Sequence, residues 1–382
     1  MKTKALDAKP DQVTARNLLK LPFYFARGAR YHAAGHIYTP KPVTAGLRVT
    51  RRCNSRCVMC SDWKRQGQEK ELTLSEIRGI LSNPLFDSIE KFGISGGETM
   101  LREDLAQIAE IVLDSFPKIK IMSVLTNGLE PDLVIKRVKE LLALTGLKRV
   151  DTFAVSVSID GYGDTHEEIR RVPRAFERVS ETIKRLKELQ HETPFYLCSN
   201  CVVQPLNITG LVQHSDFGRE VGLPITFGPV WACDLFVEGA AAQSALRLTE
   251  NQVKELRILF EGQMESRLLP SNLPFWREYF KIVGGEKRRL PCHLPYLGAN
   301  LDSDGTLYLC PADSSLVYGS VLDTPADELW YSDKAKKIRE RAKKYFCPTC
   351  TICCDLAFCL GQEFFYYARF LLREKARRLL GK

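Results

Sequence analysis

The sequence contains no long hydrophobic run. Residues 1–13 carry no apolar stretch of the length that a secretory signal requires, and no later segment approaches the length needed to span a bilayer. We therefore expect a cytoplasmic protein. The net charge is +9, but the basic residues are spread along the chain instead of forming one stripe. A nucleic-acid-binding role, which needs a basic face, is accordingly not expected.

The composition also argues against disorder and against a disulfide framework. With 45% hydrophobic and 26% charged residues, the 382-residue chain resembles a soluble globular protein, long enough for one large domain and a smaller one. Thirteen cysteines would not persist as disulfides in a reducing compartment, and their odd number argues against complete pairing. The clustered cysteines therefore indicate metal binding.

Two basic and aromatic segments lie near the ends of the chain, at residues 20–30 and 363–382. We predict that both form amphipathic helices whose aromatic side chains pack on the protein while lysine and arginine stay in solvent. The alternative is peripheral contact with a membrane surface or a partner, which would make the protein membrane-associated.

Six apolar, β-branched runs predict buried strands, and amphipathic helical stretches lie between them. Six β-α units in succession indicate a parallel sheet covered by helices, either an open doubly wound sheet or a curved partial barrel. In both geometries, functional residues belong at the C-terminal ends of the strands. The strands are expected at residues 43–50, 91–95, 119–127, 152–160, 195–203 and 224–231, and the helices at about 101–114, 131–144, 175–189 and 208–221.

Three cysteines, Cys53, Cys57 and Cys60, follow the first predicted strand and so lie on this functional edge. A structural zinc site normally uses four ligands, supplied in pairs, and the loop offers no fourth cysteine or histidine. Three thiolates on an iron–sulfur cube would instead leave one iron without a protein ligand, open to a small molecule.

The Cys-x3-Cys-x2-Cys spacing resembles the signature of the radical S-adenosylmethionine (SAM) superfamily. Later motifs extend the resemblance over residues 43–235: SGGET at 95–99, LTNG at 125–128, and SVSIDG at 156–161 followed by Arg170. The resemblance implies an α/β fold with a partial (β/α)6 barrel. It also implies a [4Fe-4S] cluster on the three cysteines, with SAM bound to the open iron.

The same resemblance implies which residues surround SAM. The Gly-Gly-Glu segment would bind the methionine amino group, and Arg170 would pair with the methionine carboxylate. For two of the motifs the alternative is a purely structural role, because Asn127-Gly128 and Asp160-Gly161 make good turns unaided. Two positions depart from the family pattern: Thr99 replaces a proline, and Arg171 stands where many relatives carry glycine. The expected cofactor-binding residues are Met59, Gly96, Gly97, Glu98, Asn127, Ser158, Asp160 and Arg170.

Three further cysteines are expected to pack without binding metal. Cys198 and Cys201 share a Cys-x2-Cys spacing, but they lie within a predicted strand, where that spacing sends them to opposite faces. Cys233 stands alone after the sixth strand, as a packing cysteine commonly does.

The remaining seven cysteines lie between residues 292 and 359. Cys292 and Cys310 flank a predicted hairpin with an Asp-Gly turn at 304 and 305, and a denser cluster follows. Two thiols on a hairpin joined to a later Cys-x2-Cys make a four-thiolate site, for which zinc is the rival to iron and sulfur. The cluster consists of Cys347, Cys350, Cys353, Cys354 and Cys359.

This C-terminal segment resembles the SPASM and twitch auxiliary-cluster domains that follow radical SAM barrels, which implies iron–sulfur. One cluster on Cys292, Cys310, Cys347 and Cys350 fits the pattern, with three spare thiols. Two clusters fit nearly as well, one of them with an open or non-cysteine site for which Asp355 is a candidate ligand. The expected domains are an N-terminal extension (1–42), the barrel (43–235), a helical linker (236–290), the auxiliary domain (291–362) and a C-terminal helix (363–382).

The activity that the resemblance implies is reductive cleavage of SAM to a 5′-deoxyadenosyl radical, which abstracts hydrogen from a substrate C–H bond. A flavodoxin- or ferredoxin-like protein would supply the electron. We expect oxidation or rearrangement of a small molecule such as a sugar, a cofactor precursor or a lipid headgroup. Maturation of a ribosomal peptide is the first alternative. A noncatalytic iron–sulfur electron carrier is the second, although a carrier needs no SAM-binding Gly-Gly-Glu segment.

Overall fold

The computed structural model describes residues 37–67, 70–233, 236–268, 273–290, 292–310 and 313–351, and a few isolated residues outside these ranges. Within the described part, no helix is long and apolar enough to cross a membrane. The two predicted terminal helices lie almost wholly outside the described residues. Cys353, Cys354, Asp355 and Cys359 also lie outside them.

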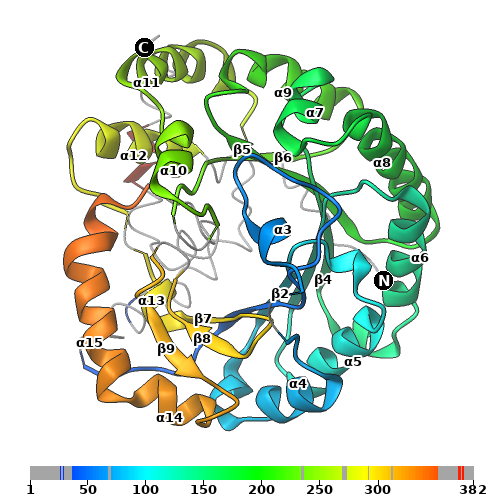
Figure 1. The fold of residues 1–382 in the computed structure, drawn as a ribbon, viewed down its shortest axis with the longest axis vertical. Helices are drawn as coiled ribbons and strands as arrows, with labels where there is room; N and C mark the ends of the chain where they lie inside the picture. The colour runs from blue at the N-terminus through cyan, green and yellow to red at the C-terminus, as the bar shows by residue number, and fades with distance from the viewer. Residues whose placement is uncertain are drawn as a thin grey trace.

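All six predicted strands are present, and neighbouring strands pair in parallel in chain order. The sheet curves, and helices surround it on the outside (Figure 1). The prediction of a partial barrel is thus confirmed. The strands are β1 (Thr44–Arg48), β2 (Lys91–Ser95), β3 (Ile121–Thr126), β4 (Thr152–Ser158), β5 (Tyr196–Val203) and β6 (Ile225–Pro229).

Each strand buries one face against the outer helices. Phe92 and Ile94 of β2, for example, are fully buried in the main core. On the inner face, Gly46, Gly93 and Ser123 lie in register on three neighbouring strands. These small residues leave space inside the barrel, unlike the large branched side chains that fill a closed (β/α)8 barrel. The covering helices are α4 (Leu74–Leu81), α5 (Leu105–Ser115), α6 (Pro131–Leu142), α7 (Asp164–Arg170), α8 (Ala175–Glu192) and α9 (Leu211–Glu220).

The predicted hairpin at the start of the C-terminal domain is present, but it does not form a separate sheet. Its first strand, β7 (Gly298–Leu301), pairs in parallel with β1, and β8 (Thr306–Tyr308) and β9 (Val317–Ser320) continue the sheet antiparallel. The barrel sheet therefore extends to nine strands in the described residues. Two helices follow, α14 (Ala326–Tyr331) and α15 (Asp333–Arg341), and lead to Cys347.

The segment predicted as a helical linker packs into a second core. It contains α10 (Ala240–Leu246), α11 (Glu250–Leu259) and α12 (Leu273–Val283), which lie between α9 and α15 in Figure 1. Trp276 and Phe260 pack there with Phe227 of β6, and the Trp276 indole donates a hydrogen bond to the Phe227 carbonyl at 3.2 Å. This segment thus covers the barrel beyond β6.

The remaining elements are short. The helices α3 (Asp62–Arg65) and α13 (Leu294–Leu297) each follow a cysteine of interest. The 3-10 and π turns are Pro84–Ser88, Thr99–Leu101, Thr145–Arg149, Ile208–Gly210, Phe260–Met264, Ala342–Phe346 and Cys347–Thr349.

Candidate active site

A cavity of about 710 Å³ opens at the C-terminal ends of the barrel strands, where the sequence placed the functional edge. It extends into the barrel as far as Lys91, at the start of β2. Of the predicted residues, those that line it are Cys53, Cys57, Cys60, Met59, Gly96, Gly97, Asn127, Ser158 and Arg170.

The loop between β1 and α3 carries the three cysteines and is here called the cysteine loop (residues 49–61). The Arg170 guanidinium donates to Cys57 Sγ at 3.6 Å, and Ser55 Oγ lies 3.0 Å from the same sulfur. Burial raises the pKa of both Cys53 and Cys60 to about 12, and the nearby Cys57 adds to the rise. Since metal binds the thiolate, loading of a cluster must release these protons.

The described residues hold no ready-made group of three or more His, Cys, Asp or Glu side chains that could bind a metal ion. Even so, the three thiols line one cavity, and Cys57 raises the pKa of the other two. Their number and type suit an iron–sulfur cube with one open iron.

Two glycines after β2 pack directly on the cysteine loop. The Gly97 amide donates to the Thr50 carbonyl at 2.7 Å, and the Glu98 amide donates to the Arg52 carbonyl at 2.8 Å. A Cβ atom at Gly96 would lie 2.6 Å from the Thr50 carbonyl oxygen. Glycine is therefore needed for the loop to approach this closely.

Glu98 supports the end of β3. Its carboxylate accepts hydrogen bonds from the amides of Met100 (3.1 Å) and Asn127 (2.6 Å) and from the Thr126 hydroxyl (2.8 Å). Burial raises the pKa of Glu98, and these hydrogen bonds oppose the rise. The residue is absent from the cavity lining. Its carboxylate thus fixes the Gly-Gly turn against β3, a role that the sequence did not indicate.

Thr99, at the position where the family pattern has proline, is also anchored to β3. It is buried, and its hydroxyl donates a hydrogen bond to the Leu125 carbonyl. The hydroxyl provides a link that proline cannot make.

Asp160 and Arg170 form an ion pair at the edge of the site. Asp160 is fully buried, its Oδ2 lies 2.6 Å from Arg170 Nη2, and its Oδ1 accepts from the Val202 amide at 2.8 Å. Burial alone would lower the pKa of Arg170, but the facing carboxylate raises it, so the guanidinium stays charged. Asp160 is absent from the cavity lining, and its carboxylate holds Arg170, whose guanidinium contacts Cys57.

The structure explains why many relatives carry glycine at the position of Arg171. It caps α7 with φ +53° and ψ 42°, a left-handed conformation that glycine adopts without penalty.

We expect Arg171→Gly to raise the free energy of unfolding by about 1 kcal/mol, because a side chain in the left-handed region costs roughly that much. Urea denaturation measures the change. Arg171→Ala is the control, since it removes the side chain but keeps Cβ. An equal gain in both variants would show that the backbone is not the cause.

Polar side chains form a row across three strands, and two of them, Asn200 and Thr226, were not predicted from the sequence. Ser158, Asn200 and Thr226 lie in register on β4, β5 and β6, and all three line the cavity. The Asn200 amide donates to Ser156 Oγ at 2.7 Å. Side chains alternate between the two faces of a strand, so the sequence could have placed Asn200 and Thr226 on the inner face. This would have required knowing which alternate residues of each strand face inward.

An aromatic wall, also missed, closes another side of the cavity. Trp63, Trp231 and Phe236 line it. The Trp63 indole donates to the Cys60 carbonyl at 2.9 Å, and Trp231 packs edge-on against Phe236 with ring centroids 5.3 Å apart. Such a wall excludes water from the neighbourhood of the cysteines.

The isolated cysteines lie near the site but apart from the three-cysteine loop. Burial alternates along β5, so Cys198 and Cys201 point to opposite faces, with Cys201 in the second core and at the cavity edge. Cys233 follows β6 in the loop that leads to Phe236.

In the C-terminal domain, four cysteines are described and come close together. Burial raises the pKa of Cys347 to about 12, and Cys292, Cys350 and Cys310 add to the rise. The Cys350 amide donates to the Cys347 carbonyl at 3.3 Å, which closes the Cys-x2-Cys turn. These are the four residues of the predicted single auxiliary site.

Comparison with known families agrees with this arrangement. The model of the radical SAM superfamily matches residues 47–217, and the model of the SPASM iron–sulfur cluster-binding domain matches residues 292–354. The chain therefore contains a radical SAM domain followed by a SPASM domain. The expected classes of cofactor, SAM and iron–sulfur clusters, are confirmed at the level of these two domains. The ligands and the number of auxiliary clusters stay predictions.

Two curated relatives, both enzymes of this superfamily, align over most of the chain. The sporulation killing factor maturation protein SkfB of Bacillus subtilis is 25% identical over 321 residues, which are 83% of this chain and 71% of that protein. The pre-heme d1 synthase of Dinoroseobacter shibae is 24% identical over 351 residues, 85% of this chain and 81% of that protein.

Other relatives align with less than half of the chain. The probable GTP 3′,8-cyclase of Methanocaldococcus jannaschii is 28% identical over 177 residues, and the match covers 46% of this chain and only 55% of that protein. Among solved structures, Streptococcus suis SuiB bound to its precursor peptide SuiA is similar, with a TM-score of 0.57, 14% identity, and coverage of 90% of this chain and 77% of that one. This likeness concerns the fold alone.

Proposed function

We propose that the chain cleaves SAM reductively and uses the resulting radical to abstract hydrogen from a substrate C–H bond. The observation that carries the proposal is the convergence of Cys53, Cys57 and Cys60 with the Gly96-Gly97 backbone on one cavity of a radical SAM barrel. A noncatalytic electron carrier would need neither this glycine turn nor a 710 Å³ cavity beside the thiols.

Cys53, Cys57 and Cys60 would hold a [4Fe-4S] cluster, and SAM would occupy the adjoining space. The bound pair supplies a low-potential electron and a sulfonium whose C–S bond breaks on reduction to give methionine and a 5′-deoxyadenosyl radical. The chain's own residues do the rest. The glycine turn presents backbone to the ligand, Arg170 places a positive charge beside Cys57, and the aromatic wall excludes water. A flavodoxin- or ferredoxin-like protein is the proposed reductant.

For the substrate we propose a small molecule that is oxidised or rearranged. The cavity supports this choice, because it combines the aromatic wall with the polar row Ser158, Asn200 and Thr226 and so suits a compact ligand with both kinds of surface. The likeness to a pre-heme d1 synthase agrees with it. A ribosomal peptide is the second candidate, supported by the likeness to SkfB and to SuiB with its precursor peptide.

The first test needs no substrate. Anaerobically reconstituted protein is expected to form 5′-deoxyadenosine from SAM and dithionite, because the open iron permits slow uncoupled cleavage. Replacing Cys53, Cys57 and Cys60 together with alanine should abolish it, whereas Cys198→Ala, on β5 outside the cysteine loop, should not. Chromatographic quantification of deoxyadenosine measures both. Full cleavage by the triple variant would refute the proposal.

A further inference from the structure

Four charged side chains form a buried cluster at the base of the cysteine loop. Arg48 ends β1, Arg51 lies two residues before Cys53, Asp62 begins α3 two residues after Cys60, and Asp302 lies in the turn between β7 and β8. Their side chains are between 4% and 9% exposed. The cluster thus joins both ends of the cysteine loop to the C-terminal domain.

Asp302 contacts both arginines. Its Oδ2 lies 2.7 Å from Arg51 Nη2, and its Oδ1 lies 3.7 Å from Arg48 Nε. Asp62 pairs with the same two arginines, with Arg51 Nη1 3.4 Å from Asp62 Oδ1. Two positive and two negative charges balance, and removing one would leave an uncompensated charge in a buried place.

The sheet register explains why Asp302 reaches this point. β7 pairs in parallel with β1, with Leu301 opposite Leu47. The next residues, Asp302 and Arg48, therefore emerge side by side at the edge where the cysteine loop begins. Asp302 Oδ1 also accepts from the Ser303 amide at 2.7 Å, which holds the carboxylate in place.

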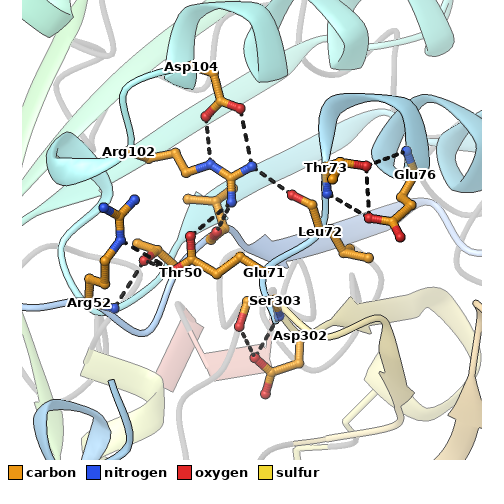
Figure 2. A network of polar contacts seen from close by, with 11 residues as sticks. Thr50, Arg52, Glu71, Leu72, Thr73, Glu76, Arg102, Asp104, Asp302 and Ser303 are labelled. Carbon is orange, nitrogen blue, oxygen red and sulfur yellow. Dashed lines mark hydrogen bonds and ion pairs between the residues drawn. The ribbon is translucent and has the colours of Figure 1, made fainter. Parts of the chain in front are cut away.

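A second connection runs from the same turn, and Figure 2 shows its part around Arg102. The Ser303 carbonyl accepts from the Leu72 amide at 2.8 Å, and the Leu72 carbonyl accepts from Arg102 Nη2 at 2.7 Å. Arg102, which also pairs with Asp104, donates from Nη1 to the Val49 carbonyl at 2.9 Å. The start of the cysteine loop is thus attached to the hairpin turn by two independent routes.

We propose that Asp302 is a positioning residue for the three-cysteine site: the C-terminal domain fixes the geometry of the cysteine loop through this carboxylate. The inference rests on the proposed function. It implies that SAM cleavage depends on the hairpin turn for a structural reason, separate from any electron transfer through auxiliary clusters.

The test compares Asp302→Asn, which keeps the shape and removes the charge, with Asp304→Asn. Asp304 lies in the same turn and accepts only a local hydrogen bond from the Thr306 amide (2.9 Å) among the contacts described. Both proteins are reconstituted as full chains. We measure iron content, deoxyadenosine formation and circular dichroism. We also measure how added SAM changes the electron paramagnetic resonance (EPR) spectrum of the reduced protein.

We expect Asp302→Asn to fold, to keep its auxiliary iron, to lose at least tenfold in deoxyadenosine formation and to show an altered response of the EPR spectrum to SAM. Asp304→Asn should match the wild type. A folded Asp302→Asn protein with wild-type spectrum and rate overturns the proposal. If Asp302→Asn does not fold, Asp302→Glu decides by the same two outcomes, a changed or an unchanged EPR response. If the wild-type protein forms no deoxyadenosine, the proposed function is wrong. The positioning role of Asp302 is then tested by comparing the iron content of the variants with that of the wild type.

Discussion

Replacing Gly97 with alanine is expected to lower deoxyadenosine formation by about two orders of magnitude or more. An added Cβ would lie 2.4 Å from the Arg52 carbonyl oxygen and 2.8 Å from that of Arg51. Both atoms are backbone of the cysteine loop, so no side-chain rotation relieves the overlap. The loop must move as a whole, and displacements of this size at a catalytic centre commonly cost about 10²-fold in rate.

Gly79→Ala is the matched control. Gly79 lies in α4, and a Cβ there would meet nothing within 4 Å. Because alanine favours a helix over glycine by about 1 kcal/mol, this variant should be slightly more stable and equally active. Iron content per chain should fall for Gly97→Ala and stay unchanged for Gly79→Ala. A Gly97→Ala protein with full iron and full cleavage would mean that the glycine turn does not contact the cysteine loop as described.

The order of the strands in the barrel was predictable because each strand has its own local pattern of apolar residues. The run at 91–95 matches β2 residue for residue, and the alternation of buried residues in 195–203 fixed the opposite faces of Cys198 and Cys201. The three cysteines and the two glycines were also accessible, since spacing and position after a strand are sequence properties. All five residues line the same cavity.

Long-range pairing was not predictable from such patterns. Nothing in residues 298–301 indicates that β7 joins β1, about 250 residues earlier, and the position of Asp302 follows entirely from that pairing. For the same reason the segment 236–290 was predicted to be a linker. Its amphipathic helices show that they must pack, but not that Trp276 would pack near Phe227 of β6.

The sequence also did not indicate which polar residues line the cavity and which lie behind it. Asp160 and Ser158 lie two residues apart in one motif, yet Ser158 lines the cavity while Asp160 is fully buried against Arg170. Burial depends on α7 folding back over the strand end, which brings Arg170 to the carboxylate. A motif gives the residue types in order, whereas packing determines which of their side chains line the cavity.

In the described part of the C-terminal domain, the buried Arg339 connects segments that carry cysteines. Arg339 of α15 lies 4.3 Å above the Trp330 ring and 5.0 Å from that of Tyr318, and its Nε donates to the Pro295 carbonyl at 2.9 Å. These contacts attach the helix that leads to Cys347 to the segments that carry Cys292 and Cys310. None of these three contacts involves the cysteine loop.

We therefore expect the protein to stay brown when Cys53, Cys57 and Cys60 are replaced with alanine, because the remaining iron and sulfide belong to residues 292–359. About four irons per chain would indicate one auxiliary cluster, and about eight would indicate two. Iron and sulfide analysis and the absorption spectrum measure this. Stoichiometric zinc in a colourless triple variant would show that the C-terminal cysteines form a structural site, with no second redox centre to accept an electron from a substrate radical.

The reciprocal variant, Cys292→Ala with Cys310→Ala, leaves the cysteine loop intact and should keep uncoupled deoxyadenosine formation while losing turnover of the true substrate. Loss of both activities together would instead mean that the hairpin cannot hold its place beside β1 without its own cluster.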